Sequence, residues 1–209
     1  MIHAYDENYL EKAMERLGDM IEYAVLDCNY NADIFFRLFI EIGVASRFEM
    51  GDPSILVGHS GPELVQIIID KTQGKKSLPT PLWREDRSEY YWCGWSLAYY
   101  QWVSRKSFLY IWSKVSIDTM RKMYSTLHEA DISKTVDVLD KLTKGSNKLP
   151  IGYLRKIKGF TQKQLSEAAG INISQLQRLE YGKRKVENLT LKIALSLSNA
   201  LGVRVEELE

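Results

Sequence analysis

The run Gly58-His59-Ser60-Gly61-Pro62 has the residue types and spacing that come nearest to those of a catalytic site. A serine in a sharp G-x-S-x-G turn after a strand can act as a nucleophile when a histidine base lies beside it. Pro62 stands where the second glycine is needed, and no alternating run elsewhere predicts the sheet that must hold such a turn. Glu63, three residues after Ser60, fits a capped helix start. We therefore expect a helix here and no enzyme activity.

Metal and redox chemistry find little support in the sequence. The chain has three histidines and two cysteines, Cys28 and Cys93, and none of them has the spacing of a zinc site. So few cysteines suit a reduced, cytoplasmic protein. No apolar run approaches the ~20 residues that a bilayer requires, and no secretion signal is visible. The prediction is a cytoplasmic protein that binds no metal, no cofactor and no membrane.

Charge is distributed unevenly along the 209 residues, although the formal net charge is only +1. Residues 1–72 carry 5 basic and 13 acidic groups, a net of −8, whereas residues 73–147 have a net of +4. Residues 148–209 carry 11 basic and 6 acidic groups, a net of +5. Such asymmetry indicates an acidic region and a basic region that suits nucleic acid.

Helical periodicity dominates the whole chain, so an all-α fold is expected. Leu10, Ala13, Leu17 and Ile21 recur at steps of three and four and predict the first helix. Serine and aspartate caps predict most later starts, and the segment KGSNKLP (144–150) marks a domain boundary. We predict a helical bundle domain over 1–145 and a second, five-helix domain over 150–209. Whether the Pro-rich segment 73–82 divides the first into two subdomains stays open.

The second domain contains two short helices joined by a glycine turn. Thr161 can cap the first of them, Gly170 forms the turn, and Asn172 can cap the second, more polar helix. This arrangement is the signature of a helix-turn-helix. A further helix over about 189–201 is expected to pack beneath it through five residues, namely Leu191, Ala194, Leu195, Leu197 and Leu201.

The string GFTQKQLSEAAGINISQLQRLEYGKR, from Gly159 to Arg184, resembles the Cro/phage-repressor (Xre-type) helix-turn-helix family in its lambda-repressor-like form. The resemblance covers about 60 residues and implies binding of double-stranded DNA, as a homodimer on a palindromic operator. It assigns the base edges to Ile173, Ser174, Gln177 and Arg178. It assigns backbone phosphates to Gln162, Gln175, Lys183, Arg184 and Lys185. Arg155 and Glu180 match positions that form a structural ion pair.

An aromatic stripe lies in the predicted helix over about 86–103. Its members are Trp92, Trp95, Tyr99 and Trp102, again at steps of three and four. Such a stripe is most often core, and its Trp and Tyr content also suits a protein interface. We keep these four residues as a possible partner surface.

Residues 5–142 resemble an uncharacterised helical region of Xre-type regulators that are encoded in toxin–antitoxin-like operons. This resemblance implies an antitoxin that represses its own operon and neutralises a toxin protein through its N-terminal domain. The alternative is a prophage-type or small-molecule-sensing repressor whose N-terminal domain is the sensor. The sequence leaves the operator, the toxin and the oligomeric state open.

Overall fold

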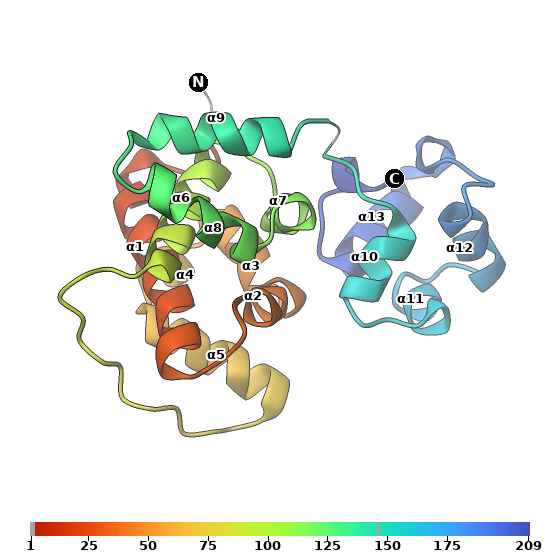
Figure 1. Ribbon diagram of the computed structural model, residues 1–209. Helices are drawn as coiled ribbons and strands as arrows, with labels where there is room; N and C mark the ends of the chain where they lie inside the picture. The colour runs from red at the N-terminus through yellow and green to blue at the C-terminus, as the bar shows by residue number, and fades with distance from the viewer. Residues whose placement is uncertain (1–2, 146) are drawn as a thin grey trace. The chain divides into compact units, whose positions relative to one another are not determined.

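The computed structural model describes residues 3–145 and 147–209. The described chain is helical and contains no β-strand, so the predicted all-α class is confirmed (Figure 1). Its residues form two compact units, the first reaching Lys144 and the second running from Gly145 to Glu209. Each unit is described by itself below.

The N-terminal unit is a bundle of helices of unequal length (Figure 1). Its elements are η1 (Glu7–Tyr9), α1 (Leu10–Glu22), the π-helical turn η2 (Tyr23–Asp27), α2 (Ala32–Glu41), α3 (Val44–Glu49), α4 (Pro53–Leu56), α5 (Gly61–Gln73), α6 (Glu89–Ser104), α7 (Phe108–Lys114), α8 (Ile117–Leu127) and α9 (Ile132–Leu142). Side-chain oxygens of Asn31, Ser88 and Asp131 accept the hydrogen bonds that start α2, α6 and α9.

Helices α1 and α6 pack so closely that glycines form their contact. A Cβ atom on Gly18 would lie 2.8 Å from the ring of Tyr91, and one on Gly94 would collide with the carbonyl group of Leu17. At Gly94 the two helix backbones therefore touch directly, and at Gly18 the Tyr91 ring packs against the backbone of α1. This close pair forms the centre of the unit, and the other helices pack around it.

Four phenylalanines, two from α2 and one each from α3 and α7, make the second part of the core. Phe36 and Phe39 of α2 pack against Phe108 at the start of α7, and Phe48 of α3 completes the group. Ring centroids lie 5.4–6.4 Å apart in tilted and edge-on arrangements, and all four side chains are fully buried. Burial of each such ring contributes roughly 1.5–3 kcal/mol.

Residues 58–62, whose spacing resembles that of a nucleophile turn, lead into a helix. Ser54 to Leu56 lie in the short helix α4, not in a strand. Ser60 Oγ accepts a hydrogen bond from the backbone N–H of Glu63, whose carboxylate accepts one from Ser60 N at 2.6 Å. Ser60 is thus held in a capping box at the start of α5.

Two helices bury other faces than the steps of three and four predict, which place Leu142 and Ile34 in the core. In α9 the buried positions are Thr135, Leu139 and Thr143, whereas Leu142 is 45% exposed. These three buried positions are four residues apart, so Leu142 lies outside the buried face and the Thr143 hydroxyl points inward. In α2, Phe36, Phe39 and Ile40 are buried and Ile34 points outward.

The described residues of the C-terminal unit form four α-helices and two 3₁₀ turns. They are α10 (Ile151–Ile157), α11 (Gln162–Ala168), α12 (Ile173–Glu180), the 3₁₀ turn η3 (Val186–Asn188), α13 (Leu191–Leu201) and η4 (Val205–Glu207). An isolated parallel bridge joins Leu149 to Leu208, and Ile151 N donates to the carbonyl of Glu209 at 2.9 Å. The two ends of the unit are therefore hydrogen-bonded to each other.

Two faces in this unit also depart from expectation. In α11 the buried small residue is Ala169 at the helix end, and Ala168 is exposed. In α13, Ala194, Leu197 and Leu201 are buried as predicted, but Leu191 and Leu195 are 70% and 44% exposed. They lie one turn apart, on the side of α13 that faces away from the core.

No helix in residues 3–145 and 147–209 has both the length and the apolar character needed to cross a bilayer. The same residues contain no group of three or more His, Cys, Asp or Glu arranged to hold a metal ion.

Candidate nucleic-acid interface

Helices α11 and α12 are set at a fixed angle by a hydrogen-bonded turn. Thr161 Oγ1 accepts from Gln164 N at 3.1 Å, and Gln164 Oε1 accepts from Thr161 N at 2.8 Å, so a capping box begins α11. Gly170, with a φ of +60°, reverses the chain after α11. Asn172 Oδ1 then accepts from Ser174 N at 2.8 Å and begins α12. These local signals, all visible in the sequence, place the second helix against the first.

The outer face of α12 is free to make contacts. Leu176 and Leu179 are buried beneath the helix, whereas Ile173, Ser174 and Arg178 are exposed. No ion pair within the described residues involves Arg178. The guanidinium of Arg178 can donate two hydrogen bonds to one base. The Ser174 hydroxyl is a second polar group, and Ile173 offers an apolar surface for a thymine methyl.

Gln177 is less available than its neighbours on α12. It is half-buried, and its Nε2 donates to Gln162 Oε1 at 3.2 Å. Gln162 Nε2 in turn donates to Glu180 Oε2 at 2.7 Å. A carboxylate can only accept, so Glu180 fixes the orientation of both amides. The motif predicts a phosphate contact for Gln162 and a base contact for Gln177; in the structure the two side chains form a chain of hydrogen bonds to Glu180.

An ion pair ties the first helix of the unit to α12. Arg155 Nε donates to Glu180 Oε1 at 2.6 Å, and its second terminal nitrogen lies 3.3 Å from Glu180 Oε2. The remaining guanidinium nitrogen donates to the Phe160 carbonyl at 2.8 Å. The side chains of Arg155 and Glu180 are only 13% and 5% exposed, so this ion pair lies inside the unit.

The loop after α12 carries the basic groups that suit phosphates. Gly182, with a φ of +66°, ends the helix, and Lys183 and Lys185 are exposed without an ion pair inside the described chain. Arg184 is half-buried and donates to the Asn188 carbonyl at 3.1 Å, so it closes the loop. Gln175 lies half-buried in the first turn of α12.

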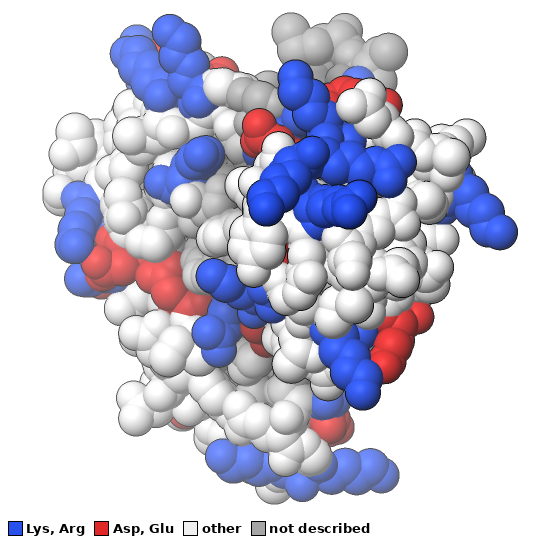
Figure 2. Space-filling model, turned by 90° about the vertical axis from the view of Figure 1, so that its right-hand side faces the viewer, with Lys and Arg blue, Asp and Glu red and all other residues white. Residues whose placement is uncertain are grey.

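One basic residue near this surface was not assigned from the sequence. Lys163 is exposed in the first turn of α11, beside Gln162, and forms no ion pair with another described residue. Its place at a helix start, where anions are favoured, is the signal that could have identified it. In Figure 2 the Lys and Arg side chains lie in several groups over the visible face, the largest of them in the upper middle of the view.

The aromatic stripe on α6 does not form the surface kept as possible from the sequence. Trp92 and Trp102 are 8% and 5% exposed; Trp92 packs edge-on against Tyr124, and His3 stacks on Trp102 at 3.6 Å. Trp95 and Tyr99 are half-buried. Because α6 is the central helix, its neighbours cover it on several sides, and two of the four residues are unavailable to a partner.

Comparison with known proteins bears on the C-terminal unit only. Residues 151–208 match the family model of helix-turn-helix domains. No curated protein and no solved structure matches the chain. The matched residues span α10 to η4, which includes every element of the interface above. Residues 151–208 are therefore similar to helix-turn-helix domains, and this match supports a DNA-binding transcriptional regulator.

Proposed function

We propose that this protein recognises a specific operator through α12 and represses the operon that encodes it. The proposal rests on one observation within the matched helix-turn-helix domain. Ser174 and Arg178 are exposed on α12 beside the exposed Lys183 and Lys185, and the three basic residues form no ion pair with a described residue. Base edges and phosphates would thus be met by neighbouring parts of one surface, as specific binding requires.

The test is a fluorescence anisotropy titration of the full chain with DNA from upstream of its own gene. Specific binding predicts an affinity 10³-fold or more above that for scrambled DNA of the same length at equal salt. Equal affinities for the two DNAs would leave only sequence-independent binding and contradict the operator proposal.

We further propose that the protein binds a palindromic operator as a homodimer. Leu191 and Leu195, exposed one helical turn apart on α13, provide apolar surface that a second copy would cover. Sedimentation of the full chain tests this. A dimer that Leu195→Asp converts to monomer supports the proposal, and a wild-type monomer at micromolar concentration with one-to-one DNA binding contradicts it.

The N-terminal unit is proposed to bind a cognate toxin and to catalyse no reaction. Support comes from the net charge of −8 over residues 1–72 and from the structural use of Ser60. The specific alternative, a small-molecule sensor, is favoured by a pocket of about 550 Å³ in this unit. Two experiments distinguish the antitoxin from the sensor. Co-expression with the neighbouring gene favours the antitoxin if the toxic product of that gene co-purifies with this chain. A metabolite that changes the affinity of this chain for its operator favours the sensor.

A further inference from the structure

An extended segment crosses the N-terminal unit between α5 and α6. We call it the strap; it comprises residues 74–88 and appears in Figure 1 as the long loop joining these helices. It is attached along its length. Tyr23 Oη donates to the Pro79 carbonyl at 2.5 Å, and Ser88 N donates to Glu22 Oε1 at 2.9 Å. The strap is therefore a preorganised surface without being a helix or strand.

Two internal ion pairs fix the middle of the strap. Arg84 binds Asp27 with both terminal nitrogens, and Leu82 N donates to the same carboxylate at 3.2 Å. Arg87 binds Asp19 at 2.9 Å and stacks over the Tyr91 ring at 4.2 Å. Both guanidinium groups of the strap are thus engaged by carboxylates of α1 and η2.

Between these attachments the strap exposes its largest apolar side chains. Trp83 is 85% exposed and Leu82 is 67% exposed, whereas Trp92 and Trp102 are nearly covered. An exposed tryptophan costs hydrophobic stabilisation, and tryptophans held in this way are the side chains that anchor protein interfaces. Because its backbone is already fixed, Trp83 would lose little conformational entropy on binding.

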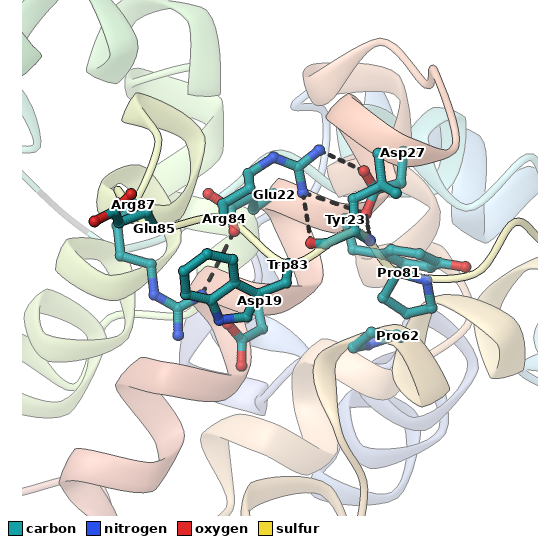
Figure 3. A pocket seen from close by; sticks show the side chains of 11 residues that line it. Asp19, Glu22, Tyr23, Asp27, Pro62, Pro81, Trp83, Arg84, Glu85 and Arg87 are labelled. Atoms are coloured by element: carbon teal, nitrogen blue, oxygen red, sulfur yellow. Dashed lines mark hydrogen bonds and ion pairs between the residues drawn. The ribbon is translucent and has the colours of Figure 1, made fainter.

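A pocket of about 550 Å³ opens beside Trp83 (Figure 3). The rings of Tyr23, Trp83 and two prolines, Pro62 and Pro81, form its apolar lining. The pocket is also lined by charged groups. They are the carboxylates of Asp19, Glu22, Asp27 and Glu85 and the guanidinium groups of Arg84 and Arg87. The lining therefore has a net charge of −2, and Glu85 forms no ion pair with any described residue.

We infer that this pocket is a docking site for an arginine or lysine side chain in an apolar-flanked, basic segment of a partner protein. The cation would lie on the Trp83 ring, near Glu85, and an adjacent apolar residue would cover Leu82. The charge of the lining selects a cation, and the exposed Leu82 and Trp83 favour a protein segment over a small free amine. The inference rests on the proposed partner-binding role of this unit and adds the chemistry of the partner.

The experiment uses the full chain with ¹⁵N-labelled tryptophan, whose five indole signals are resolved by NMR. Trp83→Phe assigns the Trp83 signal. The probe is the blocked peptide Gly-Leu-Arg-Leu-Gly, and its control has citrulline, which is isosteric but uncharged, in place of arginine. The expected result is a saturable shift of the Trp83 signal, with the citrulline peptide binding about tenfold more weakly.

Variants locate the effect. Trp83→Ala should abolish the saturable binding, and Glu85→Gln should weaken it by about two- to fivefold. Met50→Ala, which removes another exposed apolar side chain of the same unit, should leave it unchanged. Equal binding of the two peptides, or no shift of Trp83, would overturn the inference. N-acetylarginine amide binding as tightly as the peptide would also overturn it, because a small-ligand site would then be indicated.

Operator affinity of Trp83→Ala, measured in parallel, separates this inference from the proposed function. Unchanged operator affinity with lost peptide binding supports a docking site distinct from the DNA surface. If a captured toxin binds Trp83→Ala as tightly as wild type, the pocket inference fails while the antitoxin proposal stands. If the full chain fails to bind the operator but still binds the arginine peptide, the proposed function fails while the pocket inference stands.

Discussion

Arg155 and Glu180 are joined by a hydrogen bond of 2.6 Å between side chains that are 13% and 5% exposed. This pair connects α10 to the end of α12, and Glu180 also accepts from Gln162 of α11. One carboxylate therefore connects three helices, including α12, which carries the proposed base contacts.

Arg155→Met should destabilise the C-terminal unit by about 3–5 kcal/mol, because it leaves Glu180 buried with a single neutral donor. All five tryptophans lie between residues 83 and 112, so their fluorescence follows the N-terminal unit alone. Urea unfolding should show an earlier transition in circular dichroism and an unchanged one in fluorescence. Lys148→Met, which removes the exposed pair with Glu187 at 2.9 Å, is the control and should change neither transition.

Arg178→Ala should weaken specific operator binding by about 1–3 kcal/mol and relax the preference at one base position. The reason is the loss of the exposed guanidinium fork on α12. Binding selection from a randomised DNA pool measures both effects. An unchanged sequence preference in the variant would remove Arg178 from base readout.

Lys183→Ala should weaken binding to operator and scrambled DNA equally and reduce the slope of log affinity against log salt by about one. Lys183 is exposed beyond the end of α12 and has no ion pair among the described residues, so its charge is available to a phosphate. Titrations at four salt concentrations give the slope. Arg37→Ala, on an exposed site of the N-terminal unit, serves as the charge-matched control, and a slope that falls equally there would count against a local contact.

Gly94→Ala should destabilise the N-terminal unit by about 1–3 kcal/mol, since the added methyl group collides with the Leu17 carbonyl in α1. Tryptophan fluorescence in urea measures it. Gly152→Ala in α10 is the matched control, because nothing lies closer than 3.5 Å to its Cβ position. There the substitution should stabilise the C-terminal unit by about 0.5–1 kcal/mol through helix propensity, measured by circular dichroism because tryptophan fluorescence follows only the N-terminal unit. A neutral Gly94→Ala would mean that the two helices can separate at little cost.

Cys93 should resist thiol reagents at pH 8 until the N-terminal unit unfolds, whereas half-buried Cys28 reacts first. Burial raises the pKa of the Cys93 thiol from 9.0 to about 12. Above pH 9 the unfolded chain loses this proton while the native chain keeps it, so stability falls as pH rises toward 12, by at most about 1.4 kcal/mol per pH unit. Urea midpoints between pH 8 and 11 test the sign. Cys93→Ala should flatten the dependence and Cys28→Ser should preserve more of it.

Local signals in the sequence account for much of the fold. The caps at Ser60, Ser107, Ser116 and Asp131 begin helices where the residue types predict them, because each side-chain oxygen satisfies a donor in its own first turn. The helix-turn-helix was equally readable, since its glycine turns and capping box depend on neighbouring residues only.

Tertiary packing decided what the sequence could not. Leu142 and Leu191 have the spacing of core residues but face outward, whereas nearby Thr143 and Ala194 are buried. The spacing of Trp92 in the sequence was compatible both with the core and with an exposed surface. The link from Gln162 to Glu180 joins residues 18 positions apart, and that from Arg84 to Asp27 spans 57 positions, so neither leaves a periodic trace.

The bridge between Leu149 and Leu208 makes the C-terminal unit a module that closes on itself. Its entry and exit lie side by side, held by the hydrogen bond from Leu149 N to the Glu207 carbonyl at 2.7 Å and that from Glu209 N to the Leu149 carbonyl at 3.0 Å. A module with adjoining ends can be grafted into a surface loop of an unrelated carrier, or circularly permuted by a short connection across the seam. The whole unit, with the proposed recognition helix α12, could in this way be transplanted intact.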